Sequence, residues 1–262
     1  MKLLAFLAVG FAACAGAQEV VTLHTRPGVT QSFLIADIGA RKPEAAALLF
    51  SGSGGNFRLR VEDGQIRLGT ASFFVRSHAE FVRNGILPVL VTSPSDQEAG
   101  DGMGVAFRES AAHAADIRAV VAEVKQRYPG APVFVAGSSS STLSAVHLAV
   151  ALEGEIAGAV LSSTWFYRLN GRMRVLKDFD WSRIRIPLLL VHHVDDGCDG
   201  HQYYEAARLG RRFPLVTVRG GKPPESPPCR GLSPHGHFGK EAQTVDAIAG
   251  WMLGKPFARE IN

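Results

Sequence analysis

The feature that most constrains the fold is a regular alternation of short apolar segments and helical segments. Apolar runs rich in Val, Leu and Ile occupy residues 45–50, 86–91, 133–136, 156–161, 187–191 and 215–218. Segments predicted as helices lie between or after them, at residues 109–128, 142–152, 202–211 and 241–253. This alternation predicts an α/β fold, with a mostly parallel central sheet and helices on both faces. Active sites in such sheets lie at the carboxyl ends of the strands.

The individual segments support this assignment. Apolar residues at positions 117, 120, 121 and 124 recur at helical spacing, and Pro129-Gly130 ends that helix. Residues 187–191 are almost continuously branched and apolar, which is typical of a strand buried on both faces. Residues 20–25 and 29–37 predict two earlier strands joined by a Pro-Gly turn. With 262 residues, 46% of them hydrophobic, we expect a single domain over residues 18–262.

The N-terminus predicts export. Lys2 is followed by an apolar run from Leu3 and then by the small residues Ala15-Gly16-Ala17, which is the pattern of a cleaved signal peptide. We therefore expect residues 1–17 to be removed and the protein to be periplasmic or secreted. A lipoprotein modified at Cys14 is the alternative. The apolar stretch is short for a transmembrane anchor, so we expect no stable membrane insertion after cleavage.

The charge pattern argues against a polyanionic partner. The formal net charge is +4, or +3 (4 − 1) for a chain that starts at Gln18, since Lys2 is the only charged residue before it. No dense block of Lys and Arg predicts a nucleic-acid groove. We expect a small-molecule partner instead.

The cysteines fit an oxidising compartment. Once Cys14 has left with the signal peptide, Cys198 and Cys229 remain as an even pair. We predict a disulfide between them, worth roughly 3–4 kcal/mol for a loop of about 30 residues. Two buried free thiols are the alternative.

The serine run in Val-Ala-Gly-Ser-Ser-Ser-Ser, residues 135–141, raises the possibility of a nucleophile. A nucleophile elbow has a serine on a sharp turn between a strand and a helix, with small residues two positions before and after it. Ser139 is the serine that has a glycine, Gly137, at that spacing, with Ser141 on the other side. The alternative is a serine-rich N-cap of the helix, because serine is a good cap.

Partners for such a serine follow later strands in the required order. The elbow arrangement places an acid after a later strand and a histidine after the last one. Asp195 and Asp196 follow the buried strand at 187–191, and the segment Ser-Pro-His-Gly-His-Phe-Gly-Lys-Glu lies between the strand at 215–218 and the last helix. The order Ser, Asp, His is therefore present, each residue type in the loop where it is needed.

Together these motifs resemble the α/β-hydrolase superfamily, and in particular small exported bacterial proteins of that family. The similarity rests on LLFSGSGG, HHVDDGC and CRGLSPHGHFGKE. The resemblance implies an α/β-hydrolase fold with a short lid or none, in which Ser139, Asp196 and His235 act as the catalytic triad. Asp195 and His237 are the alternates. Ser141 departs from the pattern, because glycine is usual there.

The implied activity is that of a serine hydrolase acting on a carboxylic ester or a related acyl substrate, without a cofactor. His235 would take the proton of Ser139 as an acyl-enzyme forms, and Asp196 would orient the imidazole. The oxyanion hole would use backbone N–H groups of Ser140 and of the Ser53-Gly54 turn. Thioesterase, peptidase and acyltransferase activities use the same machinery. We expect the disulfide to hold the acid loop against the histidine loop.

Two other functions are open. The residues His192, His193, Asp196 and His201 could form the metal site of a metal-dependent hydrolase. Packing and hydrogen bonding at the end of the strand is the alternative reading of His192 and His193. The chain could also be a binding protein of the periplasm that uses a hydrolase fold without catalysis. The Gly-Ser-Gly-Gly turn at 52–55 lacks the further features of a dinucleotide-binding loop.

Overall fold

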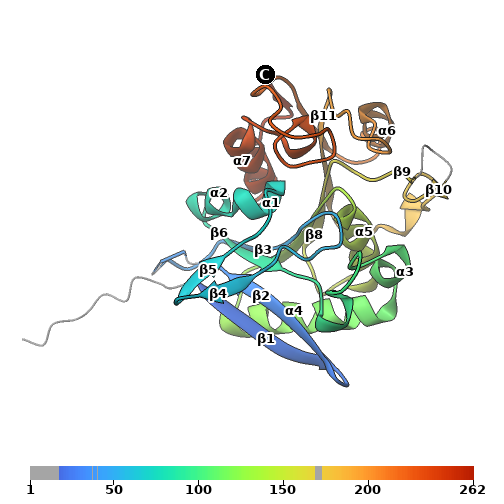
Figure 1. The fold of residues 1–262 in the computed structure, drawn as a ribbon. Helices are drawn as coiled ribbons and strands as arrows, with labels where there is room; N and C mark the ends of the chain where they lie inside the picture. Colours follow the sequence, from blue (N-terminus) through green and yellow to red (C-terminus); the bar gives the residue numbers. More distant parts are fainter. Residues whose placement is uncertain (1–17, 37, 40, 169–172) are drawn as a thin grey trace, which may run out of the picture.

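The computed structural model describes residues 18–262 except residues 37, 40 and 169–172. The predicted signal peptide at residues 1–17, with the alternative lipoprotein site Cys14, lies outside the described residues, as does residue 37 of the second predicted strand. The described chain forms a nine-stranded sheet with helices on both faces (Figure 1). The predicted α/β class is therefore confirmed.

The strand order is β1-β2-β6-β3-β7-β8-β11-β12-β13. From β6 onward in this order, neighbouring strands are parallel, whereas β1–β2 and β2–β6 are antiparallel. The bounds are β1 (Glu19–Arg26), β2 (Val29–Ile35), β3 (Ala45–Phe50), β6 (Ile86–Val91), β7 (Val133–Ser138), β8 (Gly158–Ser162), β11 (Leu188–His193), β12 (Leu215–Val218) and β13 (Glu260–Ile261).

The helices divide between the two faces. Helices α4 (Ala111–Arg127) and α5 (Ser141–Ala151) pack on one face, where α4 also runs beside β1 (Figure 1). Helices α1 (Phe73–Arg76), α2 (His78–Arg83) and α7 (Glu241–Met252) bury residues of the opposite core. The remaining helices are α3 (Val105–Arg108), which precedes α4, and α6 (Tyr203–Leu209), which packs against β11.

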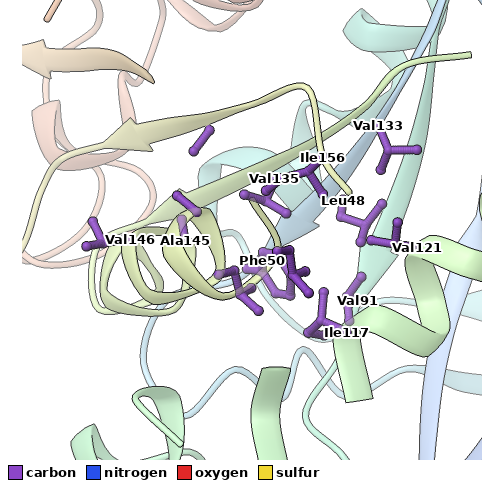
Figure 2. Packing of buried hydrophobic residues seen from close by; sticks show 14 of the residues in the cluster. Leu48, Phe50, Val91, Ile117, Val121, Val133, Val135, Ala145, Val146 and Ile156 are labelled. Atoms are coloured by element: carbon purple, nitrogen blue, oxygen red, sulfur yellow. The ribbon is translucent and has the colours of Figure 1, made fainter. Parts of the chain in front are cut away.

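The core on the α4–α5 face shows why the chain folds in this way. The side chains that alternate along β3 and β7, such as Leu48 and Val135, meet the apolar stripe of α4 at Ile117 and Val121 (Figure 2). Burying side chains of this size stabilises the fold by about 1.5–3 kcal/mol each. Ser110 caps α4 by accepting a hydrogen bond from the N–H of His113 at 3.2 Å, as serine does at helix starts.

Several short elements were not predicted. They include the hairpins β4 (Arg60–Glu62)–β5 (Gln65–Arg67) and β9 (Tyr167–Arg168)–β10 (Met173–Arg174), and the 3₁₀ turns η1 (Ser95–Gln97), η2 (Trp181–Arg183) and η3 (Pro234–Gly236). Strand β13 and helices α1, α2 and α3 were also missed. Each is too short to carry a clear periodicity. Within the described part of the chain, no helix is both long and apolar enough to cross a membrane.

Candidate active site

Ser139 lies on the sharp turn between β7 and α5. Its φ is +60°, a left-handed conformation that is uncommon for a residue with a side chain and is often held in place at functional sites. The N–H of Ser139 donates to the carbonyl of Ser162 at 2.9 Å, which fixes the turn against β8. At Gly137, a Cβ atom would lie 2.2 Å from the carbonyl oxygen of Ser141, so only glycine allows the strand and the helix to pack this closely.

Ser141 fits where glycine was expected because its backbone belongs to α5 and is not left-handed. Its side chain is buried and bridges three segments. The Oγ accepts a hydrogen bond from the N–H of Ser138 at 2.8 Å and lies 2.9 Å from the carbonyl of Phe50, to which it can donate. The hydroxyl therefore ties the turn to the end of β3.

Asp196 and His235 form a buried pair. The Nδ1 of His235 lies 2.9 Å and 3.1 Å from the two carboxylate oxygens of Asp196, so it carries a proton and donates it. The N–H of Cys198 also donates to Asp196, at 3.0 Å. Burial acts to raise the pKa of Asp196, but the hydrogen bond and charge of His235, with smaller contributions from His192 and Cys198, lower it to about 2. Asp196 is thus held as a carboxylate.

The two alternates lie elsewhere. The side chain of Asp195 is 72% exposed, and its nearest ionic partner is His193 at 4.0 Å. His237 is buried beneath the site, where its Nε2 lies 2.9 Å from the Oγ of Ser162. Burial lowers the pKa of His237 well below its usual range. It is Asp196 and His235, rather than the alternates, that contact each other.

A second histidine, His201, lies beside the serine. Its Nε2 is 3.4 Å from the Oγ of Ser139, and its ring lies edge-on to that of His235 with 4.7 Å between the ring centres. The Nδ1 of His201 is 3.0 Å from the carbonyl of Asp199, which can only accept, so Nδ1 carries the proton and Nε2 is an acceptor. Burial, together with the neighbouring His235, lowers the pKa of His201 to about 3. The sequence suggested His201 only as a metal ligand.

A cavity of about 430 Å³ opens over this cluster. Ser139 and His235 both line it, with Gly52 and Ser53 from the turn after β3. Gly52 was not among the predicted residues, although a Cβ atom there would lie 3.0 Å from the Cβ of Ser139. Gly54 turns toward the loop at 101–103, where its carbonyl accepts from the N–H of Met103 at 2.9 Å.

Arg108 supports the turn at Ser53 from behind. It is 1% exposed, and its Nη2 donates to the carbonyl of Ser53 at 2.6 Å, while its other nitrogens donate to Met103 and Ser144. The hydroxyl of Ser140 donates to the same Ser53 carbonyl at 2.8 Å. Burial lowers the pKa of Arg108 to about 10. The turn that approaches Ser139 is therefore fixed by two donors.

The predicted disulfide between Cys198 and Cys229 is present. Cys198 follows Asp196 by two residues and Cys229 precedes His235 by six, so the bond links the acid loop to the histidine loop. The hydroxyl of Ser163 holds the histidine loop from the other side by donating to the carbonyl of His235 at 2.8 Å.

The predicted set of four metal ligands does not face one common point. The Nε2 of His192 lies 2.7 Å from the carbonyl of His201, and the Nε2 of His193 lies 2.8 Å from the carbonyl of Gly220. His192 and His193 therefore form hydrogen bonds at the end of the strand, which was the alternative to metal binding. Cys198, His201 and His235 bring donor atoms within 4.8 Å of one another. The Sγ of Cys198 is in the disulfide and is not a thiolate, so this cluster lacks the ligand that a metal would need.

The comparison with solved structures bears on the fold. The chain is similar to XC6422 from Xanthomonas campestris, described as an α/β serine hydrolase without lid, at 15% identity and a TM-score of 0.54, covering 90% of this chain and 92% of that one. It is also similar to Est1E from Butyrivibrio proteoclasticus (12% identity, TM-score 0.58, 90% and 98% covered). A third similar structure is a 2,6-dihydroxy-pseudo-oxynicotine hydrolase (14% identity, TM-score 0.58, 94% and 71% covered).

No family model and no curated protein matches the chain. The likeness to these structures, together with the strand order and the β7–α5 turn, defines the chain as a protein with the α/β-hydrolase fold. The segment between β8 and β11 carries only the small β9–β10 hairpin and η2 among its described residues, as expected of a fold with a short lid or none.

Proposed function

We propose that this protein is a serine hydrolase that cleaves a carboxylic ester or a related acyl substrate through Ser139, His235 and Asp196. The observation that carries the proposal is the left-handed turn at Ser139, which shares one cavity with a histidine that is hydrogen-bonded to a buried carboxylate. Two of the similar structures named above are described as hydrolases, one of them as a serine hydrolase, which favours the same class of activity here.

In the proposed reaction, the Oγ of Ser139 attacks the carbonyl carbon as its proton passes to the Nε2 of His235. That Nε2 is buried and has no partner among the described residues, so its lone pair is available. The carboxylate of Asp196 stabilises the imidazolium that forms. The imidazolium then protonates the leaving oxygen as the carbon–oxygen bond breaks. Water attacks the acyl-enzyme by the same route and releases the acid.

The developing oxyanion needs N–H donors that are already in place, because losing one typically costs about 10²–10³ in rate. Ser140 follows the nucleophile, and its N–H has no acceptor among the described residues, nor has that of Ser53. We assign these two N–H groups to the oxyanion hole. Gly54 contributes by keeping the turn compact rather than by lining the cavity.

Export to the periplasm or the medium, after cleavage behind Ala17, is part of the proposal. The disulfide favours it, because such bonds persist in oxidising compartments. The test would express the full chain in a bacterium and determine the N-terminus and cellular fraction of the product. A cytoplasmic product that begins at residue 1 would contradict it.

The activity is tested by labelling with a fluorophosphonate and measuring the intact mass. We expect one adduct on the wild-type chain and none on Ser139→Ala, with Ser138→Ala as the matched control that still reacts. A panel of 4-nitrophenyl esters, thioesters and peptides would then separate the acyl substrates. Absence of an adduct on a folded wild-type protein would favour the alternative of a binding protein.

A further inference from the structure

The cavity over Ser139 has a charge pattern that the proposed function does not require. Among the described residues that line it, two are arginines, Arg58 and Arg230, and none is Asp or Glu. Most of the other lining residues are serine, threonine, asparagine or glycine, and the large apolar ones are Phe73 and Leu232. Small-molecule sites are usually mostly apolar, with a few polar groups that fix orientation. This cavity is thus unusually polar, and its only full charges at neutral pH are positive.

Both arginines lack the partner that a structural arginine usually has. Neither guanidinium forms an ion pair with a carboxylate of a described residue. Two nearby arginines do: Arg60 pairs with Glu62 at 3.3 Å, and Arg76 pairs with Glu241 at 2.9 Å. Arg58 and Arg230 therefore bring positive charge that no carboxylate of a described residue pairs with to the wall of the cavity.

The chain around Arg58 is shaped to hold that side chain. Arg58 has a φ of +54°, a conformation that is strained for a residue with a long side chain. Its N–H donates to the Oδ1 of Asn56 at 2.7 Å, which stabilises the turn. At Gly69, a Cβ atom would lie 2.9 Å from the Cβ and 3.1 Å from the Cδ of Arg58. The missing side chain at Gly69 makes room for the stem of Arg58.

Arg230 is held on another wall of the same cavity. It follows Cys229, which the disulfide ties to the acid loop. Its N–H donates to the carbonyl of Pro227 at 2.9 Å, and its carbonyl accepts from the hydroxyl of Ser233 at 2.8 Å. The backbone on both sides is therefore fixed, while the guanidinium remains exposed to solvent and ligand.

We propose that Arg58 and Arg230 bind a negatively charged group of the substrate, so that the enzyme prefers esters carrying a carboxylate or a similar anion besides the scissile bond. This inference rests on the proposed function, since it names the substrate class of that site. A guanidinium recognises a carboxylate or phosphate through paired N–H donors, and such charge-assisted hydrogen bonds are the stronger ones. The anion can belong to the acyl part or to the alcohol part.

The test compares esters of matched length. Mono-4-nitrophenyl glutarate and 4-nitrophenyl valerate differ by a carboxylate on the acyl part, and 3-(butyryloxy)benzoate and phenyl butyrate differ by one on the alcohol part. We expect kcat/KM to favour the anionic member of one pair, and the preference to shrink between 0.05 M and 0.5 M salt. Each of Arg58→Gln and Arg230→Gln should lower that preference about threefold to tenfold.

Arg67→Gln is the matched control, because Arg67 is an exposed arginine of the same region that does not line the cavity. Equal or better turnover of both neutral esters, or equal effects of the three substitutions, would overturn the inference. A separate readout covers an inactive protein: Ser139→Ala should bind monomethyl glutarate more tightly than methyl valerate in calorimetry, and Arg58→Gln in that background should abolish the difference. Absence of any difference there refutes the anion site, whereas missing labelling of Ser139 refutes the hydrolase.

Discussion

Two histidines compete for the role of base at Ser139, and replacing each in turn distinguishes them. The hydroxyl of Ser139 lies 3.4 Å from His201, whereas the pair with Asp196 is made by His235. Each ring carries its proton on Nδ1 and presents an Nε2 lone pair. Distance alone would favour His201. The decisive difference is the group that accepts the hydrogen bond from Nδ1 when the ring becomes an imidazolium.

The free-energy cost of protonating His201 can be worked out from its pKa. With a pKa of about 3, His201 takes up a proton at pH 7 at a cost of roughly 5 kcal/mol, since each pH unit corresponds to 1.36 kcal/mol. That cost corresponds to about 10³–10⁴ in rate. Its Nδ1 faces only a carbonyl, while the Nδ1 of His235 faces the carboxylate of Asp196. We therefore expect His235 to be the base and His201 to orient the resting hydroxyl.

The corresponding variants are His235→Ala and His201→Phe. Phenylalanine at position 201 preserves the stacking on Trp165, whose ring plane lies at 7° to that of His201. With 4-nitrophenyl butyrate at pH 7.5, His235→Ala should lose about 10³-fold or more in kcat, while His201→Phe should lose less than about tenfold. Melting curves of both variants control for folding. An equal or larger loss in His201→Phe would refute the reasoning and make His201 the base.

Four further predictions concern the groups around the site. Arg108→Met should lower kcat about tenfold to a hundredfold with little change in KM, because the turn at Ser53 loses the guanidinium that donates to it. Arg108→Lys should recover part of the rate, and a change confined to KM would contradict this prediction. Ser141→Gly should stay active but lose about 1–3 kcal/mol of unfolding free energy in urea, because the buried hydrogen bonds of the Ser141 hydroxyl disappear. A large loss of activity without loss of stability would mean that Ser139 is not the nucleophile of this turn. Cys198→Ala should lower the unfolding free energy by roughly 3–4 kcal/mol and reduce activity as well; unchanged melting and rate would show that the bond does not hold the two loops. Burial lowers the pKa of His113 to about 3, so this ring stays neutral in the folded protein but takes up a proton below pH 6.5 in the unfolded chain. The free energy of unfolding therefore falls as the pH drops from 6.5 toward 3. His113→Phe should remove roughly 3 kcal/mol of the loss that urea unfolding measures between pH 7.5 and 4.5, and an unchanged loss would mean that other groups cause it.

Several strands of the sheet could be predicted from the sequence because they are buried on both faces. Three predicted segments, at residues 45–50, 86–91 and 215–218, coincide with β3, β6 and β12. Their apolar runs end at turn residues, so both signals mark the same boundary. The β9–β10 hairpin has no such boundary, because Trp165, Phe166 and Tyr167 show neither the helical nor the strand periodicity of apolar residues. Phe166 is buried, and the hydroxyl of Tyr167 donates to Glu205 at 2.7 Å, so these two aromatic side chains pack on the chain.

The order of residues along the chain predicts which loops meet, but not which side chains face each other. It brought Ser139, Asp196 and His235 to one edge of the sheet, because parallel strands end there together. It gave no reason to expect Arg108 behind Ser53, since their contact joins positions 55 residues apart through a side chain. A buried arginine without a carboxylate has no sequence pattern that separates it from an exposed one.

His201 shows how a covalent constraint reaches beyond the residues it was expected to hold. The N–H of His201 donates to the carbonyl of Cys198 at 3.1 Å, and its own carbonyl lies 2.7 Å from the Nε2 of His192 at the end of β11. The bond from Cys198 to Cys229 thus fixes the start of the turn that brings His201 back to Ser139. The same bond brings Asp196 and His235 together. Removing the disulfide should therefore disturb the hydrogen bond between Ser139 and His201 as well as the pair of Asp196 and His235. The disulfide thus supports both histidines and not only Asp196.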